Sequence, residues 1–272
     1  MIKKIGLAQV DSSADWKENI KKADKYAREA ARQQVKLLLF PEYFMTYYPL
    51  RDGSYQGKGQ KIDGEFVQEM RNIGKRYGIW MAFGMNEIGE EKGRSYNTII
   101  VSDSEGNQRG FYRKAHLFDA YQWKESKQTI PGDQIFQPID SPIGRLGIGT
   151  CYDLRFPELA RLEALEGTEM MLYPSAWVSG EGKFMQWKVL LQARAIENEM
   201  YVFGCCHCGE HYMGRSLGFD PYGREILRGG LGEGLLVGEI ELDQIDRARQ
   251  ENPVFTNRRK DLYQLFRIDT VH

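Results

Sequence analysis

Glu42, Lys114 and Cys151 each follow a run of residues that has the composition of a strand. A thiol attacks as its thiolate, and because its usual pKa is about 8.5, it needs a base or a nearby cation to react near neutral pH. A carboxylate can serve as that base, and an ammonium group can serve as that cation. If the fold brings these three residues together, they have the chemistry for nucleophilic catalysis by a cysteine.

The segment around Cys151 has the pattern of a strand, a polar turn and a helix. Pro157 suits the first turn of a helix because its missing N–H has no intrahelical partner there, and Leu159, Leu162 and Leu165 recur at helical spacing. The thiol is therefore predicted at the carboxyl end of a strand, where open α/β sheets gather their functional groups. A buried, inert cysteine is the alternative, and this segment alone does not separate the two.

Helix-like and strand-like segments alternate along the chain without a linker or a low-complexity break. Amphipathic helices are predicted over 15–34, 64–77 and 183–199, and strands over 5–10, 37–40, 79–85, 96–102 and 170–173. The strand–helix–strand pattern of 4–42 is echoed by that of 145–175. The pattern predicts an α/β fold with antiparallel elements. Two similar halves of this kind would pack sheet on sheet, with chance similarity between buried strands as the alternative.

The charge balance favours a small-molecule partner. The chain has 37 basic and 38 acidic residues, and no basic stripe of the kind that binds nucleic acid or a membrane surface. No apolar run is long enough to span a bilayer, and the short apolar stretch near the N-terminus has the pattern of a first strand rather than a signal peptide. A cytoplasmic location is the simplest expectation.

Six segments spread over nearly the whole chain together resemble the nitrilase-related carbon–nitrogen hydrolases, most closely their Nit branch. In matching order and spacing, they are residues 40–42, 112–119, 151–158, 173–177, 192–198 and 258–263. The resemblance implies a catalytic set of Glu42, Lys114 and Cys151. It also implies a single domain over 1–272 with a four-layer αββα sandwich, which often forms homodimers or larger homo-oligomers. Residues 250–272 are expected to form a C-terminal tail at the oligomer interface.

The activity implied by the resemblance is hydrolysis of a small carboxamide to a carboxylate and ammonia through an acyl-cysteine thioester. Glu42 would take the thiol proton, and Lys114 with a backbone N–H near Tyr152 would stabilise the oxyanion. The ω-amides of short dicarboxylates are the expected substrates. The alternatives are hydrolysis of a nitrile or an N-carbamoyl group by the same three residues, or a catalytically quiet oligomeric scaffold.

Two further residues near Lys114 carry chemical groups of interest. Glu125 lies where the family usually has a second acid that supports the lysine or orients the substrate, and a solvated loop glutamate is the alternative. His116 raises the possibility of a Cys–His mechanism, since positions two apart on a strand share a face. The resemblance favours a structural role for His116.

The candidates for substrate binding and for the pocket walls are Tyr43, Tyr48, Tyr152, Arg155, Trp177 and Phe184. Arg155 can bind a substrate carboxylate through its bidentate fork. A salt bridge from Arg155 to Asp153, Glu158 or Glu197 is the alternative that we prefer. Related chains often have His-Trp where this one has Gln186 before Trp187, so the pocket is expected to differ there.

The run 204–211 contains a C-x-x-C pattern and two histidines, which suggests a zinc site. Strand alternation would send Cys205 and His207 to one face and Cys206 and Cys208 to the other, which does not build a tetrahedral site. Reduced thiols are therefore expected, with no metal. The sequence also has no glycine-rich phosphate loop, so no cofactor is expected.

Overall fold

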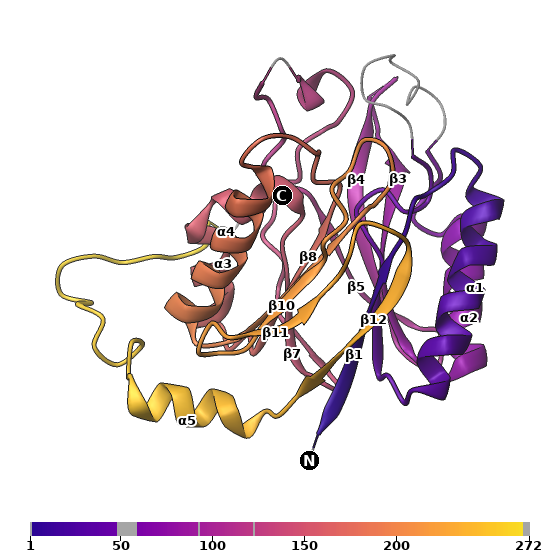
Figure 1. Cartoon of the computed structure of the whole chain (residues 1–272). Coiled ribbons are helices and arrows are strands. Elements are labelled where there is room, and N and C mark those ends of the chain that lie inside the picture. The colour runs from indigo at the N-terminus through magenta and orange to yellow at the C-terminus, as the bar shows by residue number, and fades with distance from the viewer. Residues whose placement is uncertain (1, 48–58, 92, 122, 269–272) are drawn as a thin grey trace.

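A computed structural model describes residues 2–47, 59–91, 93–121 and 123–268. Two six-stranded sheets lie between two layers of helices, as Figure 1 shows. Helices α1 (Trp16–Arg32) and α2 (Glu65–Tyr77) cover the first sheet, and α3 (Pro157–Leu165) and α4 (Lys183–Asn198) cover the second. This arrangement is the predicted four-layer αββα sandwich.

The first sheet combines parallel and antiparallel strands. Its order is β12 (Gly234–Ile240), β1 (Lys3–Gln9), β2 (Leu37–Leu39), β3 (Trp80–Ile88), β4 (Ser95–Ser102) and β5 (Gln108–Arg113). Strands β1, β2 and β3 are parallel, whereas β4 is antiparallel to both β3 and β5. Strand β5 therefore runs in the same direction as β2, and the carboxyl ends of these two strands lie at the same edge of the sheet.

The second sheet has parallel strands at its centre. Its order is β11 (Glu225–Arg228), β10 (Leu217–Phe219), β9 (Tyr201–Cys206), β8 (Met170–Ser175), β7 (Gly144–Ile148) and β6 (Ile139–Ser141). Strands β7 and β8 are parallel and are joined through α3, as β1 and β2 are joined through α1. The echo in the sequence thus corresponds to one βαβ unit in each sheet. Alternate residues of β2 face different cores, with Leu37 and Leu39 between the sheets and Leu38 under α1 and α2.

The helix ends follow from their sequences. Asp15 caps α1 by accepting a hydrogen bond from the backbone N–H of Lys17 at 2.9 Å, and Gly78 ends α2 in the left-handed conformation. The segment after Cys151 forms a 3-10 turn, η2 (Cys151–Arg155), before Pro157 opens α3. A second 3-10 turn is η1 (Glu125–Lys127), and α5 (Asp243–Glu251) precedes the tail. No helix in the described ranges is long and apolar enough to cross a bilayer.

The predicted strand 79–85 extends three residues further as β3, because the polar residues that follow it are bonded within the fold. Asn86 accepts a hydrogen bond from the Thr46 hydroxyl at 3.0 Å, and Glu87 is paired with Arg113 at 2.6 Å. Polar side chains at a buried strand end are tolerated when they have such partners. The periodicity alone did not reveal these partners.

Gly84 in β3 allows the chain that follows β2 to approach closely. A Cβ atom at this position would lie 2.5 Å from the backbone N of Tyr43 and 2.6 Å from the carbonyl oxygen of Pro41. Both neighbours are backbone atoms, so they cannot rotate away. We expect Gly84→Ala to destabilise the fold by about 1–3 kcal/mol and to displace the segment that carries Glu42.

The control for this substitution is Gly230→Ala, because a Cβ at Gly230 has no neighbour within 4 Å and its φ is not positive. Thermal unfolding followed by circular dichroism measures both variants. The expected result is a lower Tm for Gly84→Ala and an unchanged Tm for Gly230→Ala. Equal Tm values for Gly84→Ala and the parent chain would show that the close approach is not a constraint.

Candidate active site

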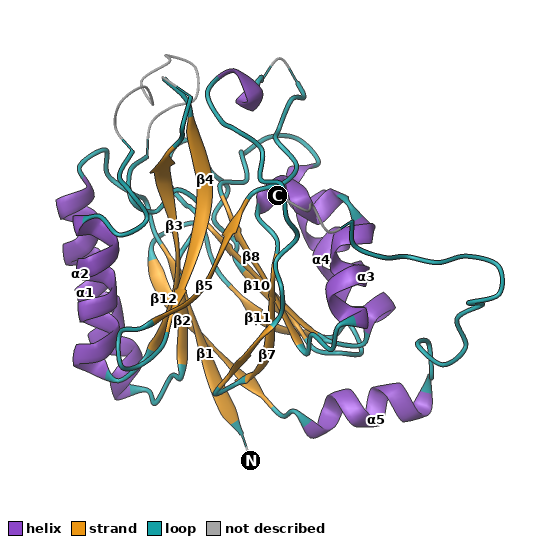
Figure 2. Cartoon of the chain, turned by 180° about the vertical axis from the view of Figure 1, so that it is seen from behind, coloured by secondary structure: helices purple, strands orange, loops and turns teal. Residues whose placement is uncertain are grey.

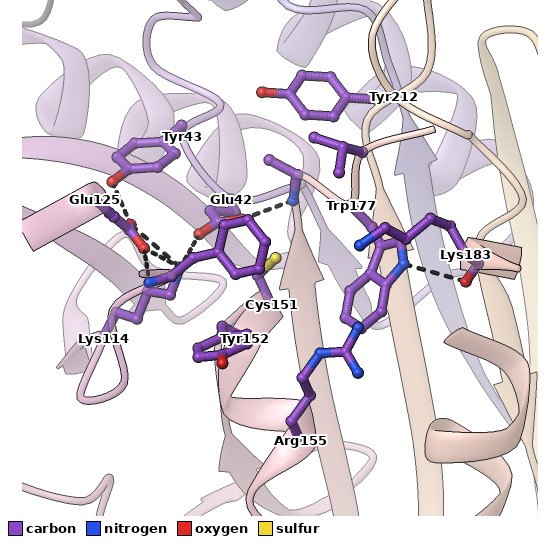
Figure 3. A pocket seen from close by; sticks show the side chains of 13 residues that line it. Glu42, Tyr43, Lys114, Glu125, Cys151, Tyr152, Arg155, Trp177, Lys183 and Tyr212 are labelled. Atoms are coloured by element: carbon purple, nitrogen blue, oxygen red, sulfur yellow. Dashed lines mark hydrogen bonds and ion pairs between the residues drawn. The ribbon is translucent and has the colours of Figure 1, made fainter. Parts of the chain in front are cut away.

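A pocket at the carboxyl ends of the parallel strands of both sheets brings together residues from both halves of the chain. It contains Glu42, Lys114 and Cys151, together with Glu125, as Figure 3 shows. Its remaining lining consists of Tyr43, Phe118, Tyr152, Arg155, Ala176, Trp177, Val178, Lys183 and Tyr212. The pocket has about 520 Å³ of empty space, part of it open to solvent. The three residues singled out for nucleophilic chemistry therefore lie around one cavity.

Glu42 is buried after β2 and accepts three hydrogen bonds. Its Oε1 receives the Lys114 ammonium at 2.9 Å and the Asn97 side-chain amide at 2.6 Å. Its Oε2 receives the backbone N–H of Ala176, which follows β8 in the other sheet, at 2.7 Å. The carboxylate is therefore fixed by donors from both sheets and points toward the thiol of Cys151 (Figure 3).

Lys114 follows β5 and is buried between two carboxylates. Its Nζ lies 2.9 Å from Glu42 Oε1 and 2.8 Å from Glu125 Oε2. Burial alone would lower the pKa of Lys114, but the charges of Glu125 and Glu42 raise that pKa well above its usual value. The lysine therefore stays protonated at any physiological pH and presents a fixed positive charge to the pocket.

Glu125 opens η1 and is 7% exposed, so it is not a solvated loop residue. Besides Lys114, its carboxylate accepts hydrogen bonds from the Tyr43 hydroxyl at 2.9 Å and the backbone N–H of Phe118 at 2.6 Å. Burial acts to raise the pKa of Glu125, but Lys114 and these donors lower it below its ordinary value. The side chain is thus an ionised partner of the lysine.

Cys151 begins η2 with a φ of 46°, in the left-handed region that a residue with a side chain rarely adopts. Such a turn presents the thiol at the tip of the bend after β7, and surrounding contacts must hold it in place. Burial and the adjacent Glu42 carboxylate raise the pKa of the thiol well above its usual value, against the lowering effect of Lys114. The resting thiol is therefore neutral, and attack on a substrate needs a base.

His116 does not line the pocket. Its ring Nδ1 lies 2.7 Å from Asp153 Oδ1, and the ring stacks on Phe156 with a centroid distance of 3.7 Å. The geometry therefore offers Glu42, rather than His116, as the base beside Cys151.

Arg155 lines the pocket, and the salt bridge that the sequence favoured for it is not formed. Within the described residues its guanidinium has no acidic partner; it donates to the side-chain oxygen of Gln186 at 2.7 Å and lies 4.9 Å from the centroid of the Trp177 ring. The preferred prediction, a salt bridge from Arg155 to an acidic residue, was wrong. The guanidinium is bonded instead to the side chain of Gln186 on α4. Tyr152 and Trp177 line the pocket as expected, and Tyr48 lies outside the described residues.

Asn97 and Lys183 belong to the site and were not identified from the sequence. Asn97 is fully buried in β4, and its amide donates to Glu42 at 2.6 Å and to Glu125 at 3.3 Å. Lys183, the first residue of α4, lines the pocket beside Arg155. A lysine at a helix start has no distinctive pattern, so nothing local distinguishes Lys183 as a site residue.

The two cysteines that end β9 face different neighbours. The Cys205 thiol lies 3.5 Å from the carbonyl oxygen of Ala8, between the sheets, whereas the Cys206 thiol lies 3.8 Å from that of Trp177. Both side chains are buried, and across the part of the chain that the structure describes no three His, Cys, Asp or Glu side chains gather as metal ligands.

The charge arrangement predicts how Cys151 reacts with iodoacetamide. Because burial and Glu42 raise its pKa, the alkylation rate should rise with pH through a midpoint above the ordinary thiol range of about 8.5. Glu42→Gln removes the negative charge beside the thiol, so it should lower this midpoint while reducing turnover by about 100-fold or more. Mass spectrometry locates the label, and the buried Cys205 and Cys206 serve as internal controls. A midpoint that rises in Glu42→Gln would contradict this charge arrangement.

The chain has relatives that match it over nearly its whole length. Residues 4–250 match the family described as Carbon-nitrogen hydrolase. The chain is 35% identical to the deaminated glutathione amidase of Bos taurus, over 95% of this chain and 83% of that protein, and 33% identical to the omega-amidase NIT2 of Homo sapiens, over 96% of each. The solved structure of Saccharomyces cerevisiae Nit3, a member of branch 10 of the nitrilase superfamily, superposes with a TM-score of 0.85 at 30% identity, over 95% of this chain and 97% of that one. The resemblance in the sequence motifs is confirmed, and the chain belongs to the carbon-nitrogen hydrolase family.

Proposed function

We propose that this chain is an amidase that converts a small carboxamide and water into a carboxylate and ammonia through a thioester on Cys151. The observation that carries the proposal is the contact of one buried ammonium, Lys114, with two carboxylates beside the thiol. The amidase names of the two relatives support the same reaction class.

Acylation begins when the Cys151 sulfur attacks the amide carbonyl carbon and its proton passes to Glu42. The negative charge that develops on the carbonyl oxygen is stabilised by Lys114 and by the backbone N–H of Tyr152, which lies in the first turn of η2 and has no intrahelical partner. The tetrahedral intermediate collapses when the C–N bond breaks, and Glu42 returns its proton to the nitrogen, which leaves as ammonia.

Deacylation uses the same groups in the same roles, with water as the nucleophile. Glu42 removes a proton from water, the hydroxide oxygen attacks the thioester carbon, and Lys114 again stabilises the oxyanion. The C–S bond then breaks, the sulfur recovers the proton from Glu42, and the product leaves as the carboxylic acid, which loses its proton to solvent and becomes the carboxylate. Because Glu42 becomes neutral twice per turnover, Lys114 needs a permanent partner. Glu125 supplies it, since its contact of 2.8 Å with Lys114 does not depend on Glu42.

The other end of the pocket favours an acyl group with a carboxylate. Arg155 and Lys183 both line it, and among the described residues neither has an acidic partner. Burial and the charge of Arg155 lower the pKa of Lys183. Two neighbouring cations without an anion favour binding of a negatively charged group. The ω-amide of a short dicarboxylate places its amide at Cys151 and its free carboxylate at these cations.

An ammonia-release panel tests this proposal. The substrates are succinamate, its neutral analogue butyramide, butyronitrile and N-carbamoyl-β-alanine, with Cys151→Ala as the inactive control. We expect the highest kcat/KM for succinamate and a covalent mass increase on Cys151 during turnover. A wild-type chain that folds but releases no ammonia from either amide would remove the amidase assignment, and preferential release from the nitrile or the carbamoyl compound would replace it.

The same substrates test the proposed carboxylate-binding subsite independently of the catalytic step. Lys183→Met should raise KM for succinamate by about tenfold, as expected for loss of one charged hydrogen bond, and leave butyramide unaffected. Lys188→Met is the matched control, because Lys188 lies on the same helix but pairs with Glu225 at 3.1 Å outside the pocket. Equal effects of Lys183→Met on both amides would exclude a role in carboxylate binding.

We also propose a cytoplasmic location and a homo-oligomer built through the C-terminal tail. All four cysteines are free thiols, which fits a reducing compartment. The tail loops outward after α5 and then returns to the sandwich (Figure 2), where Arg267 donates to the carbonyl oxygens of Ile135 and Phe136 at 2.6 Å. It exposes Leu262, Phe266 and Ile268 at 68%, 71% and 83%. Apolar side chains exposed together in this way are typical of a protein interface.

Sedimentation velocity tests the role of the tail. The double substitution Leu262→Asp with Phe266→Asp should shift the chain toward the monomer, because it places charges on the exposed apolar surface without touching a buried residue. The control is Ile2→Asp, which changes an exposed apolar residue at the opposite end of the chain. An unchanged oligomer in the tail variant would place the interface elsewhere.

A further inference from the structure

Asp153 joins the two loops that carry the nucleophile and the lysine. Its carboxylate is fully buried, two residues after Cys151 in η2. Its Oδ2 accepts the backbone N–H of Thr150 at 2.8 Å and the Tyr112 hydroxyl at 2.8 Å. Its Oδ1 accepts the backbone N–H of His116 at 3.0 Å and faces the His116 Nδ1 at 2.7 Å.

These contacts lie on both sides of each reacting residue. Thr150 and Asp153 flank Cys151, whereas Tyr112 and His116 flank Lys114. The Tyr112 hydroxyl also accepts the backbone N–H of Ala115 at 3.1 Å, so one carboxylate is linked to the chain before and after the lysine. Strand β5 belongs to the first sheet and η2 follows β7 of the second. The carboxylate therefore connects the two sheets at the point where their functional side chains must meet.

The chemistry of this position requires a carboxylate. All four groups around Asp153 present hydrogens to it, and an ionised carboxylate is the side chain that only accepts. An asparagine would place an N–H₂ group against two donors in a site without water exposure, which leaves buried groups unpaired. The backbone of Cys151 is held in the left-handed region, which persists only where surrounding contacts fix it.

We propose that Asp153, oriented by the His116 side chain, is a positioning residue that sets the distance and angle between the Cys151 thiol and the Lys114 ammonium. The inference rests on the proposed amidase chemistry, to which it adds a residue that contacts neither substrate nor thiol. The sequence raised His116 as the base of a Cys–His mechanism. In this proposal the ring does not exchange a proton with the substrate; it donates a hydrogen bond that orients the Asp153 carboxylate.

Asp153→Asn tests the proposal. A displacement of about 1 Å in a reacting group costs on the order of 100-fold in rate, so kcat for succinamate should fall by about 100-fold while KM stays within about threefold. The matched control is Glu163→Gln. Glu163 is also fully buried beside β7 and accepts the Ile148 N–H at 2.8 Å, but it has no contact with the Lys114 loop. Glu163→Gln should retain kcat; equal losses in both variants would show a general effect of buried carboxyl groups and overturn the proposal.

Two substitutions of His116 keep the proposal testable if Asp153→Asn does not fold. His116→Asn places an amide N–H where the ring Nδ1 lies, whereas His116→Leu removes the donor, and both lose the stacking on Phe156. We expect kcat near the wild-type value for His116→Asn and a tenfold or greater loss for His116→Leu. Equal kcat in the two variants would contradict the proposal, as would wild-type kcat in a folded Asp153→Asn.

The alkylation rate of Cys151 at pH 7 provides a readout that does not depend on a substrate. Displacement of Lys114 from the thiol removes a charge that favours the thiolate, so Asp153→Asn and His116→Leu should react more slowly with iodoacetamide than the wild type and Glu163→Gln. If the wild type releases no ammonia from any amide, the proposed function fails, but this comparison still decides whether Asp153 positions the pair. Identical alkylation rates in all four proteins would overturn the positioning role.

Discussion

A buried ammonium group between two carboxylates is the constraint on which the rest of this structure depends. Transfer of an ion from water to a protein interior costs on the order of several kcal/mol, and removal of one partner from a buried pair costs about 3–5 kcal/mol. Lys114 is 2% exposed, and the fold tolerates its buried charge only if it also places Glu42 and Glu125 beside it. These residues lie 72 and 11 positions from Lys114 in the chain, so the fold must deliver them together.

The architecture meets this constraint through strand direction and close backbone packing. The carboxyl ends of β2 and β5 share one edge of the first sheet, and the second sheet adds the donor N–H of Ala176 and the thiol of Cys151. Gly84 lets the segment after β2 lie against β3 without a side chain between them. The site is thus formed between two sheets, and its geometry depends on the contacts that cross from one to the other.

The sequence predicted those features that a local pattern can carry. Apolar runs that end in a reactive residue identified Glu42, Lys114 and Cys151, and amphipathic spacing located the helices that form α1, α2 and α4. Contacts between distant segments could not be predicted in this way. The partner of Arg155 is Gln186, which lies 31 residues away, and periodicity contains no information about that pairing. Asn97 was missed for the same reason, because its partners come from two other segments.

The two ends of the pocket are constrained differently, and this difference bears on how the enzyme can change its substrate. Each charged group at the chemical end has several fixed donors or acceptors, so a substitution there leaves a buried charge unpaired. Arg155 and Lys183 at the acyl end have no acidic partner in the described structure, and their replacement leaves no buried anion behind. Substitutions of Arg155 on η2 and of Lys183 on α4 can therefore alter the acyl group that is accepted without loss of the ammonium cluster. Gln186, where related chains often have histidine, lies on α4 at this end of the pocket and holds Arg155.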